Sequence, residues 1–243
     1  MKKIAVIPAR FAATRFPGKL MQKIGDKTVI RLVYENTLSM EIFDEVVVVT
    51  DNDAIVDEIK SIGGQVKKST RDHFSGTDRI AEAIEDMDVD VVINMQGDEP
   101  FVEAGPLKKM VDAFLDESVC VASIIQKLKA DEDINNPNVV KVVCNKYNNA
   151  IYFSRSPIPY KRNLQSALPV YKHIGVYGFR KNTLLAFTKW PIGLLEQTEM
   201  LEQLRFIENG VGIKMVEAES NSIGIDTPED LEKARAIFAN RPA

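Results

Sequence analysis

Residues 45–68 decide the fold class, and they read EVVVVTDNDAIVDEIKSIGGQVKK. The segment opens with valines at successive positions, the pattern of a parallel strand that is covered on both faces. Apolar residues at helical spacing follow, and Gly63-Gly64 stands where that helix must stop before the next strand. A strand, a helix and a strand in this order predict a β-α-β unit with parallel strands.

The same alternation continues on both sides of this segment. We expect strands at Ile4–Pro8, Glu45–Thr50, Val66–Lys68, Val89–Asn94 and Val119–Ile125. We expect helices at Thr28–Leu38, Ala54–Ile62, Thr77–Met87 and Pro106–Leu115, the third of them capped by Ser75 or Thr77. This pattern predicts a doubly wound α/β fold, with a mostly parallel central sheet and helices on both faces.

The pattern changes after about residue 130, where proline-containing segments interrupt the periodicity. Strands are expected at Val139–Cys144, Ala150–Ser154, His173–Phe179 and Gly212–Val216, with a helix at Leu194–Glu208. The first three of these strands favour a β-rich antiparallel extension. Thr227 as N-cap and Pro228 at the first helical position predict a last helix that continues over Leu231–Phe238. No flexible linker separates these parts, so we expect one domain.

Composition limits the classes of function. The chain has 243 residues, 45% of them hydrophobic, and a formal net charge of −4. An acidic chain is a poor general nucleic-acid binder, so an anionic ligand must meet a local basic patch. Only a short apolar run precedes Pro8, which fits neither a signal peptide nor a membrane span and favours the cytoplasm. Cys120 and Cys144 lie in valine-rich runs typical of small buried strand residues.

A local basic patch follows the first strand. Residues 8–19 read PARFAATRFPGK, and this segment carries Arg10, Arg15 and Lys19, with Gly18 allowing close approach of the backbone to a ligand. Ligands of open α/β sheets bind beyond the carboxyl ends of the strands, so a polyphosphate is the expected ligand. The alternative is a solvated basic loop. The glycine motifs of P-loop and dinucleotide-binding proteins are absent from the sequence.

Two carboxylates also follow strand-like segments. Asp98 lies in a turn after the strand that ends at Asn94, where a nucleotide-bound Mg²⁺ would be held by one or two carboxylates and phosphate oxygens. Asp226 precedes the last helix and could pair with Asp98 across the sheet. The structural alternatives are a polar turn for Asp98 and part of a helix cap for Asp226.

Residues 73–79, HFSGTDR, form a weaker signal for a second part of a nucleotide site, because small hydroxyl residues and backbone donors stand at a helix start. The chain has only two histidines, His73 and His173, so a histidine-rich metal site or a Ser-His-Asp triad has few possible members.

Together these motifs resemble the 3-deoxy-manno-octulosonate cytidylyltransferases, the CMP-Kdo synthetases of lipopolysaccharide biosynthesis, over nearly the whole chain. The resemblance rests on IPAR (7–10), RFPGK (15–19), SGTDR (75–79), QGDEP (96–100), YFSRSPIP (152–159), HIGVY (173–177), LEQLR (201–205) and DTPED (226–230). It implies a nucleotide-diphospho-sugar transferase fold, a homodimer, and the reaction of CTP with 3-deoxy-manno-octulosonate (Kdo) to give CMP-Kdo and pyrophosphate.

The resemblance also assigns roles to residues. The nucleotide would be bound by Pro8, Ala9, Arg10, Arg15, Lys19, Ser75, Gly76, Arg79 and Gln96. The sugar acid would be bound by Gln96, Arg155, His173, Tyr177, Glu202 and Gln203, the last two on a helix. The catalytic residues would be Arg10, Lys19, Asp98 and Asp226, the two aspartates holding Mg²⁺. The nucleotide part would span about 1–130, the sugar and dimerisation part about 131–220, and a closing strand and helix 221–243.

Alternatives stay open at this point. Leu20-Met21 and Lys172 depart from the family's usual residues, and the 8-amino analogue of Kdo is a second candidate sugar. A metal-dependent glycosyltransferase is a rival enzyme, although the basic loop favours an intact triphosphate. A nucleotide-binding regulatory or scaffold protein is a rival outside enzymes. The choice of cytosine rests on the resemblance alone.

Overall fold

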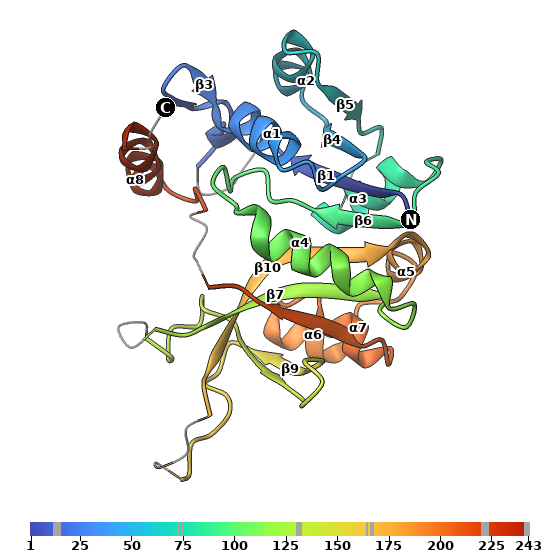
Figure 1. The fold of residues 1–243 in the computed structure, drawn as a ribbon, viewed down its shortest axis with the longest axis vertical. Helices are drawn as coiled ribbons and strands as arrows, with labels where there is room; N and C mark the ends of the chain where they lie inside the picture. The colour runs from blue at the N-terminus through green and yellow to red at the C-terminus, as the bar shows by residue number, and fades with distance from the viewer. Residues whose placement is uncertain are drawn as a thin grey trace. The chain divides into compact units, whose positions relative to one another are not determined.

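The computed structural model describes residues 1–11, 16–71, 73, 75–129, 133–163, 165, 168–219 and 224–240 (Figure 1). The chain forms two compact units: residues 1–104 with 221–243 make unit 1, and residues 105–220 make unit 2. These units are defined by how the chain packs and not by what each part binds. The assignment of one domain with a nucleotide part and a sugar part therefore stays a prediction.

Unit 1 is built on four parallel strands in the order β6-β1-β4-β5. Their bounds are β1 Lys3–Ala9, β4 Glu45–Thr50, β5 Gln65–Lys68 and β6 Val91–Asn94, within two residues of the expected strands. Ile4, Val48 and Ile93 on three of these strands are fully buried, as successive apolar positions require of a sheet covered on both faces.

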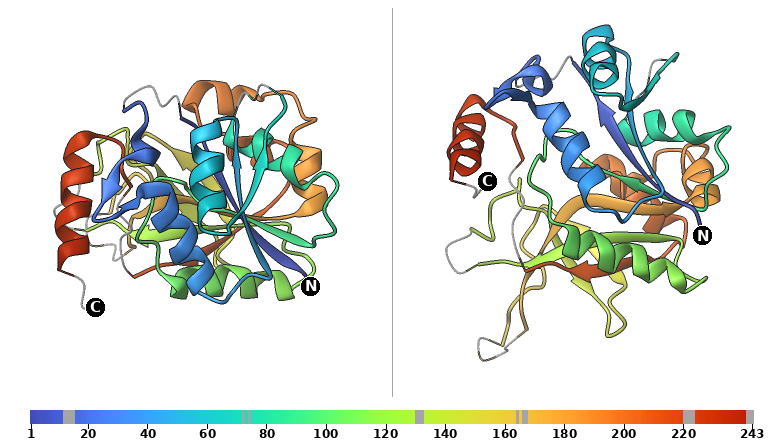
Figure 2. Two further views of the ribbon diagram at one scale, coloured as in Figure 1. Left: turned by 90° about the horizontal axis from the view of Figure 1, so that it is seen from above. Right: turned by 45° about the horizontal axis from the view of Figure 1, so that its top comes forward.

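Short segments and helices complete unit 1. They are the 3-10 helix η1 Lys19–Met21, the hairpin strands β2 Lys23–Ile24 and β3 Lys27–Thr28, and the helices α1 Val29–Ser39, α2 Asp53–Ser61, α3 Gly76–Ile84 and α8 Pro228–Ala239. Side chains of Thr28, Asn52, Ser75 and Thr227 cap these helices. The N-cap at Thr227 with Pro228 in the first turn is confirmed, and α8 lies beside the β2–β3 hairpin (Figure 2).

The strand order places a topological switch at β1 (Figure 1). The chain runs from β1 to β4 and β5, and then returns to β6 on the other side of β1. Right-handed crossovers put α1 and α2 on one face of the sheet and α3 on the other. Ligands of such sheets bind beyond the carboxyl ends of the strands next to the switch, where the basic loop follows β1 and Asp98 follows β6.

Unit 2 combines parallel and antiparallel pairing. Its elements are α4 Ala104–Asp112, η2 Ala113–Leu115, β7 Val121–Lys127, β8 Lys141–Cys144, β9 Ala150–Ser154, β10 Tyr171–Arg180, α5 Lys181–Phe187, α6 Leu194–Glu199, α7 Leu204–Glu208 and β11 Ile213–Glu217. β11 runs parallel to β7, while β7 with β10, β10 with β8, and β8 with β9 are antiparallel pairs. The mixed α/β fold class and the antiparallel extension are therefore confirmed.

Some expectations about elements were wrong. The helix expected over 194–208 is two helices, because Met200 adopts a left-handed backbone (φ +53°) and the carbonyls of Glu199 and Met200 accept hydrogen bonds from Arg155. The third helix stops at Ile84, three residues early. α5 and the β2–β3 hairpin were not foreseen. Residues 224–227 form no strand, so the closing strand is not found among the described residues there.

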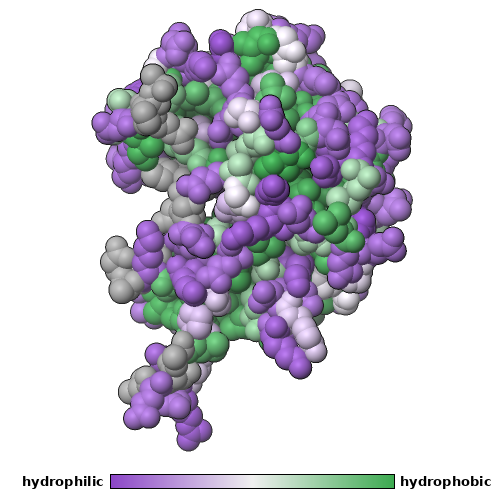
Figure 3. All heavy atoms as spheres, in the orientation of Figure 1, coloured by the Kyte–Doolittle hydropathy of each residue, from purple (hydrophilic) through white to green (hydrophobic). Residues whose placement is uncertain are grey.

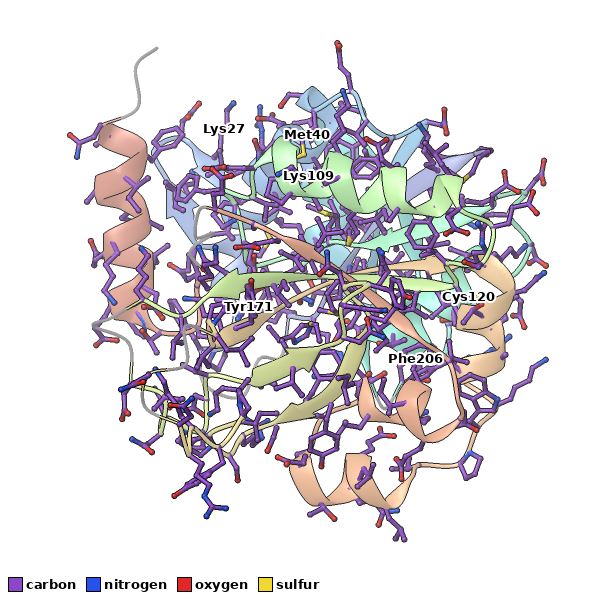
Figure 4. The ribbon with its side chains drawn as sticks, turned by 60° about the horizontal axis from the view of Figure 1, so that its bottom comes forward. Lys27, Met40, Lys109, Cys120, Tyr171 and Phe206 are labelled. Atoms are coloured by element: carbon purple, nitrogen blue, oxygen red, sulfur yellow. The ribbon has the colours of Figure 1, made fainter. Side chains whose placement is uncertain are left out.

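Figure 4 shows three landmarks of unit 2: Tyr171 on β10, Phe206 on α7, and Cys120 just before β7. Cys120 and Cys144 are free and only half-buried, less buried than expected. Within the described ranges, no helix is long and apolar enough to cross a membrane. Hydrophilic side chains cover much of the face drawn in Figure 3.

Candidate active site

The basic loop leaves the end of β1 and returns to the sheet at Lys19. Arg10 is exposed, and its Nη2 donates to the His73 carbonyl at 3.3 Å. Residues 12–15 lie outside the described residues, and Arg15 with them. Gly18 has φ +70°, a left-handed conformation that residues with a side chain rarely adopt. This turn directs the next residue, Lys19, toward the carboxyl end of β6.

Lys19 lies between the two predicted carboxylates. Its Nζ donates to Asp98 Oδ2 at 2.5 Å and to Asp226 Oδ1 at 3.0 Å. The Ile225 amide donates to the Asp98 carbonyl at 2.9 Å, which fixes the segment before α8 beside the turn after β6. A Cβ on Gly97 would stand 2.9 Å from the Pro8 carbonyl oxygen, so the turn requires glycine to approach β1 this closely. The predicted pairing of Asp98 with Asp226 is thus present.

The two carboxylates control the charge of Lys19. Burial alone would lower the pKa of its ammonium, but Asp98 and then Asp226 outweigh that effect and raise the pKa above its ordinary value. Lys19 is therefore a cation held by two carboxylates at neutral pH. Its ammonium group lies between two carboxylates, a position that also suits a small cation with oxygen ligands.

The donor set suits Mg²⁺ when a nucleotide is bound. Mg²⁺ commonly takes one or two carboxylates, phosphate oxygens and water. In the described part of the chain, no group of three or more His, Cys, Asp or Glu side chains is placed to hold a metal ion. Asp98 and Asp226 converge on one cation, so the remaining ligands of a bound Mg²⁺ would come from substrate and water.

The start of α3 offers a second polar position in unit 1. Ser75 and Asp78 form a capping box, and Gly76 is the first helical residue. Arg79 is 3% exposed, and its Nη2 donates to Asp51 Oδ2 at 2.6 Å. Its Nε and Nη1 are buried and have no hydrogen-bond partner among the described residues. Buried guanidinium donors without acceptors are costly, so this site suits an acceptor-rich ligand.

A compact network anchors the loop before α3. Glu82 accepts hydrogen bonds from Ser69 Oγ at 2.7 Å and Thr70 Oγ1 at 2.6 Å, and its Oε2 lies 2.5 Å from His73 Nε2. Burial would raise the pKa of Glu82, but these hydrogen bonds lower it to about 2. Because Arg10 contacts the His73 carbonyl, the network also supports the basic loop.

Four of the predicted sugar-binding residues lie on β10 and in the turn between α6 and α7 of unit 2. His173 and Tyr177 lie on one face of β10, with ring centroids 5.2 Å apart. Burial lowers the pKa of His173 to about 3. Burial, followed by the charge of Glu202, raises the pKa of Tyr177 well above its ordinary value. Both rings are therefore neutral near pH 7.

Arg155 and the α6–α7 turn differ in part from expectation. Glu202 and Gln203 lie in the turn between α6 and α7 and not within a helix, Glu202 exposed and Gln203 buried. Arg155 Nε donates to the Glu199 carbonyl at 2.7 Å, and Nη1 donates to the Pro137 carbonyl at 2.8 Å. Its side chain thus fixes this turn to the end of β9. Gln96 lies in unit 1, half-buried beside Gly97.

Three residues were missed by the sequence analysis. Asp51 follows β4 as Asp98 follows β6, and the same strand-end signal would have found it. Ser123 is a hydroxyl residue within the otherwise apolar run VASII at 121–125, and a hydroxyl in a buried strand needs a hydrogen-bond partner. Glu82 gives no sequence signal, because its partners lie in a loop that only the fold brings back to α3.

Comparisons with known proteins agree with this geometry. A family profile described as Cytidylyltransferase matches residues 4–219. A 3-deoxy-manno-octulosonate cytidylyltransferase of Flavobacterium johnsoniae is 53% identical, over 98% of this chain and 99% of that protein. That of Christiangramia forsetii is 51% identical, over 97% of this chain and 96% of that protein.

Solved structures show the same relationship. A CMP:2-keto-3-deoxy-manno-octonic acid synthetase complexed with CTP has a TM-score of 0.94 and 38% identity, over 98% of this chain and 99% of that chain. A cytidylyltransferase from Leptospira borgpetersenii has a TM-score of 0.66 and 18% identity, over 100% of this chain and 89% of that chain, and so shows a similar fold alone.

Proposed function

The chain belongs to the 3-deoxy-manno-octulosonate cytidylyltransferases and transfers CMP from CTP to Kdo, and we propose that Lys19, Asp98 and Asp226 form its reaction centre. The products are CMP-Kdo and pyrophosphate, and the name of the enzyme implies a role in lipopolysaccharide biosynthesis. Family membership removes the two rival classes, the glycosyltransferase and the non-enzymatic scaffold.

The observation that carries the proposal is the convergence of both carboxylates on one cation, Lys19 Nζ, at 2.5 and 3.0 Å. When CTP binds, the Lys19 ammonium would exchange a carboxylate for phosphate oxygens, and the carboxylates would hold Mg²⁺. Bound Mg²⁺ would lower the pKa of the attacking sugar hydroxyl and offset charge at the α-phosphate. Mg²⁺ dependence is therefore part of the proposal.

The reaction itself exchanges one phosphorus–oxygen bond for another. The anomeric hydroxyl of Kdo attacks the α-phosphorus and releases its proton to solvent, and the bond from that phosphorus to pyrophosphate breaks in line. Arg10 and Lys19 stabilise the negative charge that builds on the phosphates. No side-chain base is required if the hydroxyl is already acidified.

For the nucleotide, the proposal assigns two regions of unit 1. The basic loop binds the triphosphate through Pro8, Ala9, Arg10, Arg15 and Lys19. The start of α3, together with Gln96, binds the rest through Ser75, Gly76 and Arg79. The support from the structure is the pair of unpartnered donors on Arg79, which a nucleotide oxygen or nitrogen acceptor would satisfy.

For the sugar acid, the proposal assigns Gln96, Arg155, His173, Tyr177, Glu202 and Gln203. Support comes from the paired rings on β10 and from the turn that brings Glu202 and Gln203 between two helices. A homodimer in the cytoplasm is proposed on the resemblance, and exposed apolar residues on α6, such as Leu194, offer a surface for a second copy. Light scattering tests the dimer.

The experiment is an assay of pyrophosphate release with purified protein. CTP, ATP, GTP and UTP are each tested with Kdo and with its 8-amino analogue, with Mg²⁺ and with excess chelator. The proposal expects release with CTP and Kdo that depends on Mg²⁺. Full activity in chelator would contradict the metal assignment, and preference for the 8-amino sugar would correct the substrate.

A further inference from the structure

A register shift in β10 places a buried hydroxyl beside the ring of His173. The antiparallel pairing of β10 with β7 is regular up to Ile174, and resumes with a shift at Tyr177, which stands opposite Ser123. Such a bulge leaves backbone groups outside the ladder and changes where side chains point. Ser123 is fully buried at this place.

Hydrogen-bond counting at Ser123 fixes where the proton of His173 lies. Ser123 Oγ is 2.9 Å from His173 Nε2, 2.8 Å from the Val176 carbonyl and 3.4 Å from the Ile174 carbonyl. A hydroxyl has one proton, and a carbonyl oxygen can only accept. Ser123 therefore donates to Val176 and accepts from His173. Nε2 of His173 carries the proton, and Nδ1 keeps its lone pair.

The surroundings of the ring favour this neutral form. Phe153 packs edge-on against His173 with ring centroids 5.1 Å apart, and Tyr177 covers it from the same strand. Burial is the cause that lowers the pKa of His173 to about 3. No carboxylate contributes to that shift, so an imidazolium would have no counter-charge there.

Two lysines on the neighbouring strands have partners of their own. Lys141 on β8 donates to the carbonyls of Asn136 and Arg155. Lys127 on β7 forms an ion pair with Glu217 on β11 at 3.2 Å. Tyr177 is a titratable group in contact with the ring, and the charge of Glu202 acts on Tyr177.

We propose that Ser123 is a positioning residue that holds His173 as a neutral imidazole with a free lone pair on Nδ1. His173 then accepts a hydrogen bond from a hydroxyl of the sugar acid, and does not bind the carboxylate as a cation. This inference rests on the proposed function, which assigns His173 to the sugar. A site built to accept from a hydroxyl strongly rejects an analogue that lacks it, so the arrangement provides specificity.

The first test needs no substrate. NMR of the full chain labelled with ¹⁵N-histidine reports the protonation of each ring nitrogen, and His173→Gln assigns the signals because the sequence has only two histidines. We expect His173 to carry its proton on Nε2 alone from pH 8 to 5.5. Ser123→Ala should populate the other tautomer, and Ser123→Thr should restore the first. An imidazolium at pH 6.5, or a proton on Nδ1 in the wild type, overturns the proposal.

The second test uses pyrophosphate release. Ser123→Ala should raise KM for Kdo about 2- to 12-fold, the effect of one net hydrogen bond, with KM for CTP unchanged and recovery in Ser123→Thr. In the wild type, KM for Kdo should stay level between pH 5.5 and 8. Among Kdo analogues that each lack one hydroxyl, one should react poorly with the wild type, because it lacks the hydroxyl that donates to His173. His173→Phe should cause no further loss of activity with that analogue.

The outcomes separate the inference from the function on which it rests. A KM for Kdo that rises with pH near 6.5, or equal reaction of all deoxygenated analogues, overturns the role of His173 as an acceptor. If no pyrophosphate is released from CTP and Kdo, the proposed function fails, while NMR still decides the tautomer. If Ser123→Ala does not fold, the wild-type spectrum and Ser123→Thr decide.

Discussion

Glu196 and Arg205 form a buried ion pair that joins α6 to α7, and Glu196→Gln tests how strongly it holds the turn between them. Arg205 Nε and Nη2 donate to the two carboxylate oxygens of Glu196 at 2.6 and 2.5 Å. The side chains are 8% and 7% exposed. The guanidinium carbon lies 4.1 Å from the ring centre of Phe187. Glutamine would remove the negative charge of Glu196 from this buried guanidinium.

The expected loss follows from that burial. Removing one partner of a buried pair costs about 3 to 5 kcal/mol, a large part of the roughly 5 to 15 kcal/mol that stabilises a typical protein. At about 2 to 4 °C per kcal/mol for a chain of this size, Tm should fall by about 6 to 20 °C. Urea unfolding followed by the fluorescence of Trp190, the only tryptophan, measures the change close to the pair.

Glu232→Gln is the matched control, because Glu232 pairs with Arg235 at 2.5 Å on α8 but is 69% exposed. That variant should change the free energy of unfolding by less than about 1 kcal/mol. A loss below about 1 kcal/mol for Glu196→Gln would refute the reasoning. So would equal losses in the two variants.

Three further predictions concern the site. Lys19→Ala should weaken the binding of CTP more than the binding of Kdo in titration calorimetry, since this ammonium is assigned to the triphosphate. An unchanged CTP affinity would favour the alternative of a solvated basic loop. Tyr177→Phe should raise KM for Kdo with little change for CTP, by about 1 to 3 kcal/mol if a buried polar partner is left unpaired, and a loss borne by CTP would count against it. His173 has a pKa of about 3 in the folded chain and an ordinary value of 6.5, so the unfolded chain binds more protons between these values and stability falls as pH is lowered. The free energy of unfolding should fall by about 2 kcal/mol from pH 7 to 5 because of His173, and this part of the loss should be absent in His173→Phe. If the free energy of unfolding changes with pH equally in the two proteins, His173 does not make this contribution.

Strands and capped helices could be predicted because local chemistry decides them. The successive valines of β4 are typical of a parallel strand that is covered on both faces, and Thr227 with Pro228 sets a helix start from within its own sequence. The break at Met200 within the helix expected over 194–208 could not be predicted, because the left-handed Met200 depends on Arg155, 45 residues away.

The candidate site shows the same difference between local signals and contacts that only the fold creates. Asp98 and the basic loop could be named because strand ends of parallel sheets collect ligands. Asp226 follows no strand at 224–225 and could be named from its place before the capped start of α8. That Lys19 would bridge the two carboxylates required the fold, since 79 and 207 residues separate it from them. Ser123 could not be assigned a role at all, because its function depends on a bulge in a different strand.

The most direct test of the reaction centre is the turnover of Asp98→Asn. Pyrophosphate release is measured at saturating CTP, Kdo and Mg²⁺, with CTP affinity determined separately by calorimetry. Because the charge of Asp98 acts mainly in the transition state, turnover should fall by about a hundredfold or more while CTP affinity stays within a few-fold. Near-normal turnover in this variant would contradict the assignment of Asp98 and its partner to the chemistry.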